Sequence, residues 1–384
     1  MTDSSENLSL YIHFPFCASK CRYCDFYSVP HHANLLDDYL KAIILEWKNI
    51  SHNKLCTTSK IQTIYFGGGT PSILSPEQFA FLHDELISKL NLSENYEWSI
   101  ECNPDSYTDE KALIYRNRGV TRLTFGIQSF NNKELSVLGR RHSAEKALNV
   151  LNSPLLAHFN SIGLDLMFGI PLQTTESFLN SLSTALSSPY IKHFSLYELT
   201  LNDHTPFGRH YRKLPLPDDD MICEMTSSSL QKCTNLGFEH YEISNYALPS
   251  FHSRHNEIYW DHKNYIGLGA SAHSYFHPLR WSNIADISSY IEKTFAGDST
   301  TDFTENIDGV KLANELLFLG LRRRTGINEE LYLKRTGTVF YNAITNSKLD
   351  EFVNNGFLIH ESPWWRPTEK GMLYADAMAR ELFI

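Results

Sequence analysis

The sequence lacks any run of about 18 or more apolar residues, so nothing in it predicts a membrane-spanning helix. Its first residues contain neither the basic segment nor the apolar stretch of a signal peptide. Basic residues are also outnumbered, because 34 Lys and Arg stand against 44 Asp and Glu, for a net charge of −10. A protein built mainly to bind nucleic acid would carry a basic excess. These absences predict a cytoplasmic protein without a nucleic-acid partner.

Cysteine is scarce, and its number is odd, seven in 384 residues, which argues against a disulfide framework. Four of the cysteines are scattered along the chain. The other three share one short loop with the spacing C-x₃-C-x₂-C, at Cys17, Cys21 and Cys24. This loop follows a strand-like run directly and is the most specific pattern in the sequence.

Three thiolates at this spacing can bind three of the four irons of a 4Fe-4S cluster. The fourth iron then stays open to a small chelating ligand, because position 26, where a further cysteine could stand, is Phe26. A zinc site is the main alternative. Structural zinc takes four ligands, usually as two closely spaced pairs, and the nearby histidines fit no such pair. We therefore predict a 4Fe-4S cluster on this loop.

The same loop, with Tyr23 before its last cysteine, resembles that of the radical S-adenosylmethionine (radical SAM) superfamily. In that superfamily, the amino and carboxylate groups of S-adenosylmethionine bind the open iron. From Tyr11 onward the chain resembles the oxygen-independent coproporphyrinogen dehydrogenase branch and, within it, the haem chaperones. The resemblance implies a 4Fe-4S cluster and S-adenosylmethionine as cofactors, and haem as cargo.

Six short apolar runs alternate with helical patterns over the first 200 or so residues. The predicted strands are Leu8–Phe14, Ile61–Phe66, Glu97–Glu101, Arg122–Ile127, Ser161–Met167 and His193–Glu198. Such alternation predicts right-handed β-α-β units, and near-continuous apolar runs are typical of a parallel sheet covered on both faces. Six strands are too few to close a (β/α)8 barrel. We expect an α/β fold with an open partial (β/α)6 barrel of the radical SAM type, which the resemblance also implies.

The pattern changes after about residue 215, where a proline-rich linker ends in acidic residues. A compact helical tail follows from about Val310 and closes with one predicted helix, from Thr368 to Leu382. We expect three parts. They are the radical SAM partial barrel over 1–215, a connecting segment packed on the barrel over 216–305, and a small, mainly helical, winged-helix-like C-terminal domain over 306–384.

Glycine and polar residues stand at the ends of successive predicted strands, where the chemistry of such folds collects. The turn after the second strand contains Gly68, Gly69 and Thr70, and glycine lets backbone approach a ligand closely. The other candidates are Glu101, Gln128, Arg140 and Asp165. One such residue alone would be read as a solvated or structural charge, but four at successive element ends are typical of a binding site.

The resemblance implies roles for these residues. Gly68, Gly69 and Thr70 would bind the amino group of S-adenosylmethionine. Tyr23 belongs to the same site, and the further contacts would be Tyr11, Glu101, Gln128, Arg140 and Asp165. Arg140 suits a carboxylate because a guanidinium pairs with it through two hydrogen bonds. Strand alternation turns Cys102 away from Glu101, so we expect it to be structural.

A second motif, H-N-x-x-Y-W, runs from His255 to Trp260. A histidine beside aromatic residues can ligate haem iron, while Tyr259 and Trp260 pack on the macrocycle. A structural histidine in an aromatic cluster is the alternative. The motif resembles that of the haem chaperones, which implies haem contact by His255. The later Arg322–Arg324 run could bind propionates or nucleic acid, although we expect a solvated helix end.

Two departures separate the chain from the coproporphyrinogen dehydrogenases. Those enzymes carry a further cysteine where this chain has Phe26, and a longer N-terminal arm than the ten residues before Tyr11. We expect a haem chaperone that transfers haem to acceptor apo-proteins. The alternative is an oxygen-independent coproporphyrinogen III dehydrogenase, a radical SAM oxidative decarboxylase. The resemblance is compatible with a homodimer, with a peripheral position at the membrane and with acceptors there.

Overall fold

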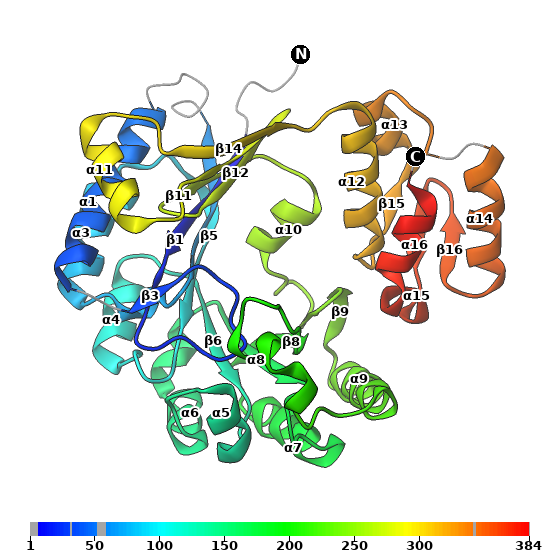
Figure 1. The fold of residues 1–384 in the computed structure, drawn as a ribbon, viewed down its shortest axis with the longest axis horizontal. Helices are drawn as coiled ribbons and strands as arrows, with labels where there is room; N and C mark the ends of the chain where they lie inside the picture. The colour runs from blue at the N-terminus through cyan, green and yellow to red at the C-terminus, as the bar shows by residue number, and fades with distance from the viewer. Residues whose placement is uncertain (1–6, 31–32, 52–58, 341–342, 384) are drawn as a thin grey trace.

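The computed structural model describes residues 7–30, 33–51, 59–340 and 343–383. Its main feature is one 12-stranded sheet, with the strand order β14-β13-β12-β11-β1-β4-β5-β6-β7-β8-β10-β9 (Figure 1). The six central strands that the sequence predicts are β1 (Asn7–Phe14), β4 (Lys60–Gly68), β5 (Leu92–Cys102), β6 (Arg122–Gln128), β7 (Ser161–Phe168) and β8 (Ile191–Glu198). Each pairs in parallel with the next, which confirms the predicted α/β partial barrel.

Helices connect these strands and cover the outside of the sheet (Figure 1). They are α1 (Ala33–Ser51), α3 (Pro76–Glu85), α4 (Asp109–Asn117), α5 (Asn132–Leu138), α6 (Ala144–Leu151) and α7 (Thr175–Leu186). The short α8 (Pro206–Arg209) follows β8. Ser75, Thr108 and Ser143 each cap the helix that follows, because the side chain accepts a hydrogen bond from a backbone amide of the first turn. Ser75 forms a capping box with Gln78.

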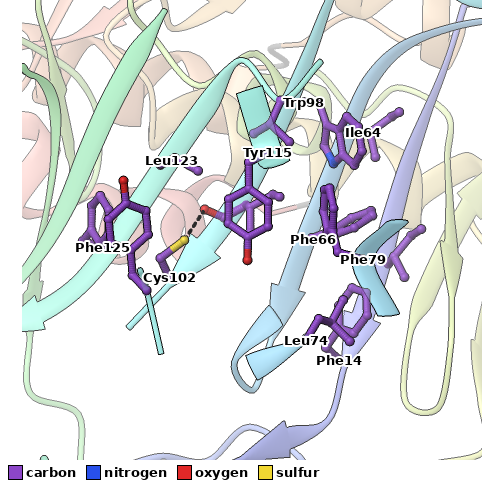
Figure 2. Close-up of a cluster of buried hydrophobic side chains, with 14 of the residues drawn as sticks. Phe14, Ile64, Phe66, Leu74, Phe79, Trp98, Cys102, Tyr115, Leu123 and Phe125 are labelled. Carbon is purple, nitrogen blue, oxygen red and sulfur yellow. Dashed lines mark hydrogen bonds between the residues drawn. The ribbon is translucent and has the colours of Figure 1, made fainter. Parts of the chain in front are cut away.

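The two faces of the central strands differ more than their apolar sequences suggest. On β1, Leu8, Leu10 and Ile12 are buried in the core between sheet and helices. Figure 2 shows this core around Phe66, Trp98 and Phe125 of the following strands. The alternate residues face the barrel interior and are polar, as where Thr63 Oγ1 lies 2.8 Å from Ser9 Oγ. The prediction that both faces are covered is confirmed, because residues of both faces are buried, but the inner face is polar and not apolar.

The segment after residue 215 adds strands to both edges of the sheet. Its elements are α9 (Asp219–Asn235), β9 (Glu239–Glu242), β10 (Asn245–Ala247), α10 (Arg254–Trp260), β11 (Tyr265–Leu268), β12 (His273–Phe276), β13 (Leu279–Asn283), α11 (Ile287–Ala296) and β14 (Thr301–Asn306). β10 lies antiparallel to β8, whereas β11 lies parallel to β1. The connection between barrel and tail is thus part of the sheet itself.

The C-terminal region has a three-stranded sheet and a hydrophobic core of its own. It consists of α12 (Gly309–Leu321), β15 (Ile327–Asn328), α13 (Glu329–Thr336), α14 (Ala343–Asn354), β16 (Leu358–Glu361), β17 (Trp364–Pro367), α15 (Glu369–Leu373) and α16 (Ala375–Leu382). The single final helix predicted from Thr368 to Leu382 was wrong. Tyr374, with φ −114° and ψ 15°, leaves the helical conformation and separates α15 from α16.

The Arg322–Arg324 run joins the C-terminal region to the barrel. The Ile243 amide donates to the Arg322 carbonyl at 3.0 Å, and the Arg324 amide donates to the Tyr241 carbonyl at 3.1 Å. The run therefore lies along the outer edge of β9 like a short added strand. The predicted helix end is confirmed, because Arg322 is the C-cap of α12, but the run is half-buried and the expected solvation was wrong. None of the described helices has the length and apolar character that crossing a bilayer requires.

Candidate functional site

The three-cysteine loop lies beyond the carboxyl end of β1. The short strand β2 (Phe16–Cys17) pairs with β3 (Val29–Pro30) and draws the two ends of the loop together. The middle is held from both sides, since the Arg22 amide donates to the Leu138 carbonyl at 3.0 Å, and the Phe207 amide donates to the Arg22 carbonyl at 3.1 Å. These contacts fix the loop over the open end of the barrel.

All three cysteines line one cavity of about 350 Å³ at this end of the barrel. The predicted residues that share it are Tyr23, Gly68, Gly69, Thr70, Glu101, Gln128, Arg140 and Asp165. The structure therefore brings together the ends of β4 to β7, as expected for parallel strands. Asn103 and Tyr197 also line the cavity, and sequence reasoning missed both. Tyr197 could have been found, because it lies at the end of the sixth predicted strand.

The chemistry of the three thiols suits an iron–sulfur cluster. Among the described residues, no three His, Cys, Asp or Glu side chains converge as ligands of one ion. A 4Fe-4S cluster does not need such convergence, because each thiolate binds a different iron. Burial raises the pKa of Cys17, and it raises the pKa of Cys24 to about 11. A positively charged cluster would favour the thiolate forms, as bound metal does for coordinating thiols.

The glycine turn after β4 packs against the cysteine loop. A Cβ atom on Gly69 would lie only 2.7 Å from the Phe14 carbonyl oxygen and 3.0 Å from Cys17 Sγ. Gly68 has φ +105°, and a Cβ atom there would meet the His13 ring. Its amide, 3.1 Å from Glu101 Oε2, is already used as a donor. These glycines therefore allow close backbone packing and help to orient Glu101.

Two carboxylates, Glu101 and Asp165, enter the cavity from β5 and β7. Burial raises the pKa of Glu101 to about 7, although the Tyr65 hydroxyl donates to it at 2.7 Å. Burial also raises the pKa of Asp165 to about 6. Each is harder to ionise than an exposed acid, so a positively charged ligand between them would be favoured.

Arg140 Nε and Gln128 Oε1 are among the buried polar atoms of cavity-lining residues that have no hydrogen-bond partner in the described part of the chain. Another Arg140 nitrogen, Nη2, donates to Asn103 Oδ1 at 2.6 Å and to the Gly126 carbonyl at 2.5 Å. Gln128 adopts φ +66°, a conformation uncommon for residues other than glycine. An unpaired buried donor and an unpaired buried acceptor indicate that a polar ligand completes this site.

Known proteins resemble this chain over nearly its whole length. Residues 11–185 match the family model of the radical SAM superfamily. The heme chaperone HemW of Lactococcus lactis subsp. lactis (strain IL1403) is 32% identical over 94% of each chain. That of Escherichia coli (strain K12) is 31% identical over 98% of each. The chain belongs to the HemW family.

The fold is shared more widely than this family. The solved structure of coproporphyrinogen III oxidase (HemN) from Escherichia coli, a radical SAM enzyme, superimposes with a TM-score of 0.85 at 20% identity. The match covers 99% of this chain and 91% of that one, and it confirms the radical SAM type of barrel. Membership of the superfamily implies a 4Fe-4S cluster and S-adenosylmethionine. The clustered thiols and the unpaired Arg140 and Gln128 atoms fit both groups.

Two predicted residues, Tyr11 and His255, do not line the cavity. His255 is fully buried, with Nδ1 2.7 Å from Thr63 Oγ1 and Nε2 2.8 Å from the Tyr259 hydroxyl. Its ring stacks on Tyr65 with centroids 5.0 Å apart, and Tyr11 lies next to both. In this HemW-family chain, His255 could bind iron only after one of its hydrogen bonds broke. Its haem contact therefore stays a prediction.

Proposed function

We propose that Cys17, Cys21 and Cys24 hold one 4Fe-4S cluster and that S-adenosylmethionine binds beside it in the 350 Å³ cavity. The bound cluster supplies an open iron to which an amino acid can chelate. The support for this comes from the three thiols and the unpaired polar atoms of Arg140 and Gln128, which line the same cavity.

The proposed roles of the chain's own residues follow from their chemistry. The Arg140 guanidinium binds the ligand's carboxylate, because its Nε is unpaired and charge-assisted bonds of this kind are strong. Gln128 Oε1 accepts a hydrogen bond from a hydroxyl of the ligand. Glu101 and Asp165 face the positively charged part, which favours their ionised forms. Gly68 and Tyr65 hold Glu101 in place through hydrogen bonds.

We propose that the protein is a haem chaperone, which binds haem and hands it to acceptor apo-proteins. The similarity to proteins named heme chaperone HemW carries this proposal, because it extends over almost all of both chains and well beyond residues 11–185. Phe26 adds support. It lines the cavity and is 61% exposed at the position where the coproporphyrinogen dehydrogenases would carry a further cysteine.

The test is anaerobic reconstitution of the cluster, followed by three measurements on the same sample. We expect saturable haem binding, transfer of that haem to apomyoglobin as a probe acceptor, and no decarboxylation of coproporphyrinogen III. The alternative, an oxygen-independent coproporphyrinogen III dehydrogenase, predicts protoporphyrinogen formation that is lost when Cys21 is replaced. That product, without haem transfer, would overturn the chaperone proposal.

The proposal extends to where the chaperone works. We propose a cytoplasmic protein that delivers haem to acceptors at the membrane, binds that surface peripherally and forms a homodimer. Flotation with vesicles measures the membrane contact, and sedimentation equilibrium measures the oligomeric state. A protein that does not float with vesicles would contradict the proposed membrane contact. A monomer at micromolar concentration would contradict the proposed homodimer. Neither result would affect the proposal of haem transfer.

A further inference from the structure

Side-chain hydrogen bonds connect two of the cluster cysteines through a residue that sequence reasoning missed. The Thr70 hydroxyl donates to Cys17 Sγ at 3.6 Å. Arg140 Nη1 donates to Cys21 Sγ, also at 3.6 Å. Asn103 lies between these two donors, since its Nδ2 donates to Thr70 Oγ1 at 2.9 Å and its Oδ1 accepts from Arg140 Nη2 at 2.6 Å. One amide group therefore bonds to a donor of each cysteine.

The chemistry of these groups fixes the direction of their hydrogen bonds. A guanidinium can only donate, so the Asn103 oxygen must face Arg140 and the Asn103 nitrogen must face Thr70. The Thr70 oxygen accepts from that nitrogen, which leaves the hydroxyl hydrogen for Cys17. A reversed amide would place two donors against each other at Arg140. Asn103 therefore determines the direction in which the Thr70 hydroxyl donates.

The backbone of Asn103 is fixed at the end of β5. Its amide donates to Ser72 Oγ at 3.1 Å. Its carbonyl accepts from the amides of Ser106 and Tyr107, at 3.0 and 3.1 Å. Ser72 follows Thr70 by two residues in the chain. The turns after β4 and β5 are thus joined at the point where the Asn103 side chain bonds to Thr70.

A glycine makes room for the contact between Asn103 and Arg140. A Cβ atom on Gly126 would lie 3.3 Å from Asn103 Oδ1 and 3.6 Å from Arg140 Nη2. Arg140 uses Nη1 for Cys21, and it uses Nη2 for Asn103 and the Gly126 carbonyl. Its Nε has no partner among the described residues and is left for the proposed carboxylate. One guanidinium can therefore serve the cysteine and the ligand together.

The hydrogen bonds to Cys17 and Cys21 affect the redox chemistry of a cluster bound there. Hydrogen bonds to the sulfurs are among the factors that set the reduction potential of an iron–sulfur cluster. An added electron makes the cluster and its thiolates more negative, so a donor at a ligand sulfur stabilises the reduced form more than the oxidised form. Partners that orient such donors influence the metal without touching it.

We propose that Asn103 is a positioning residue of the cluster site. It orients the Thr70 hydroxyl toward Cys17 and Arg140 Nη1 toward Cys21, and it thereby raises the one-electron reduction potential of the bound cluster. This inference rests on the proposed 4Fe-4S cluster and deepens it, because it names a residue that helps to set the potential of that cluster. Asn103 lines the cavity but needs no contact with S-adenosylmethionine for this role.

The test is a redox titration of the reconstituted full-length protein without S-adenosylmethionine, followed by electron paramagnetic resonance. Asn103→Leu is similar in size but removes both side-chain bonds, and we expect a ratio of reduced to oxidised cluster about tenfold lower at a fixed potential. For a one-electron couple this is a shift of about 59 mV to more negative values. Asn202→Leu is the matched control and should keep the wild-type potential. Asn202 Nδ2 donates to Asp25 of the same loop at 2.8 Å, and of the described residues that line the cavity, neither is one.

A second variant tests the path of the effect. Thr70→Val removes only the donor to Cys17 and should shift the potential in the same direction by a smaller amount. Because Asn103 acts partly through Thr70, the double variant Asn103→Leu/Thr70→Val should shift the potential no further than Asn103→Leu alone. Shifts that simply add would overturn the positioning role, as would a wild-type potential in Asn103→Leu.

The outcomes separate this inference from the proposed function. Wild-type protein that binds no 4Fe-4S cluster would overturn both. A wild-type cluster whose potential is the same in Asn103→Leu would overturn the inference and leave the cluster assignment standing. If Asn103→Leu does not fold, Asn103→Ala replaces it and is judged by the same potentials. Loss of the cluster from both folded variants would show that Asn103 is needed to hold the site together, which would also overturn the inference.

Discussion

The two motifs that the sequence singles out occupy different environments. The cysteine loop lies on the rim of the barrel, where its three half-exposed thiols open into a cavity. The H-N-x-x-Y-W helix points His255 into the barrel interior, where both ring nitrogens are bonded. Both motifs consist of residues that bind metals. Cys17 and Cys21 accept hydrogen bonds at 3.6 Å but still line the cavity, whereas His255 is fully buried. Residue type and spacing indicate which chemistry is feasible, and accessibility decides whether it is used.

The largest effect is expected from the cysteine loop. Replacing any one of Cys17, Cys21 and Cys24 by Ser should abolish a stable 4Fe-4S cluster, because three of its irons depend on these thiolates. Iron and sulfide content after anaerobic reconstitution measures the loss. Cys233→Ser is the control, since Cys233 is buried in the hydrophobic core outside the cavity. Full iron loading in the triple mutant would contradict the cluster assignment and remove the contrast between the two motifs.

The next effect concerns ligand binding beside the cluster. Arg140→Ala should weaken S-adenosylmethionine binding by about 1.5–3 kcal/mol, the range for a hydrogen bond to a charged group, with normal iron content. Titration calorimetry on the reconstituted protein measures the change. Arg141→Ala, at the exposed neighbouring arginine, serves as the control. If iron were lost together with affinity, Arg140 would be stabilising the fold or the cluster loop instead.

The third prediction concerns His255 itself. His255→Ala removes two buried hydrogen bonds and leaves Thr63 and Tyr259 without them, which should lower the free energy of unfolding by about 1–3 kcal/mol. Thermal unfolding measures this loss, and cluster content should not change. A Soret band altered in His255→Ala, with normal cluster content, would support the predicted haem contact through this motif.

The smallest expected effect is a pH dependence of stability and of ligand affinity, caused by Glu101 in the cavity at the cysteine loop. Burial raises the pKa of Glu101 from 4.5 to about 7, so between these values the folded protein holds a proton that the unfolded chain releases. The stability of the ligand-free protein should therefore fall as pH rises through this range. Affinity for the positively charged S-adenosylmethionine should rise over the same range as Glu101 ionises. Glu101→Gln should reduce the pH dependence of both curves and leave that of Asp165, whose pKa is raised to about 6, and two unchanged curves would show that Glu101 does not contribute.

The central fold could be predicted because its signals are local. Each of the six strands is a short apolar run, and the helix starts at Ser75, Thr108 and Ser143 depend on residues within one turn. The cavity at the cysteine loop could be predicted from the parallel topology, which places the ends of neighbouring strands at one edge of the sheet. For this reason Glu101 and Asp165 could be named before their contacts were known.

The features that could not be predicted depend on contacts between residues that are far apart in the sequence. The Arg322–Arg324 run ends α12, as predicted, but its burial depends on β9, about 80 residues earlier, which provides an edge for it. The hydrogen bond from His255 to Thr63 spans 192 positions. The left-handed backbone of Gln128 has no composition signal, because nothing nearby marks it as a turn. Long-range pairing, rather than weak local signal, set the limit of the prediction.

The position of β1 has a consequence for how the chain acquires its structure during synthesis. β1 pairs on one side with β4 and on the other with β11, whose residues Tyr265–Leu268 are made some 250 positions later. At about 5–20 residues per second, the ribosome needs roughly 10–50 seconds to cover that interval. Until then, the strand leading into the cysteine loop has an open edge, which is prone to pairing with other chains. The cluster site is translated first, and its supporting sheet is completed among the last parts of the barrel.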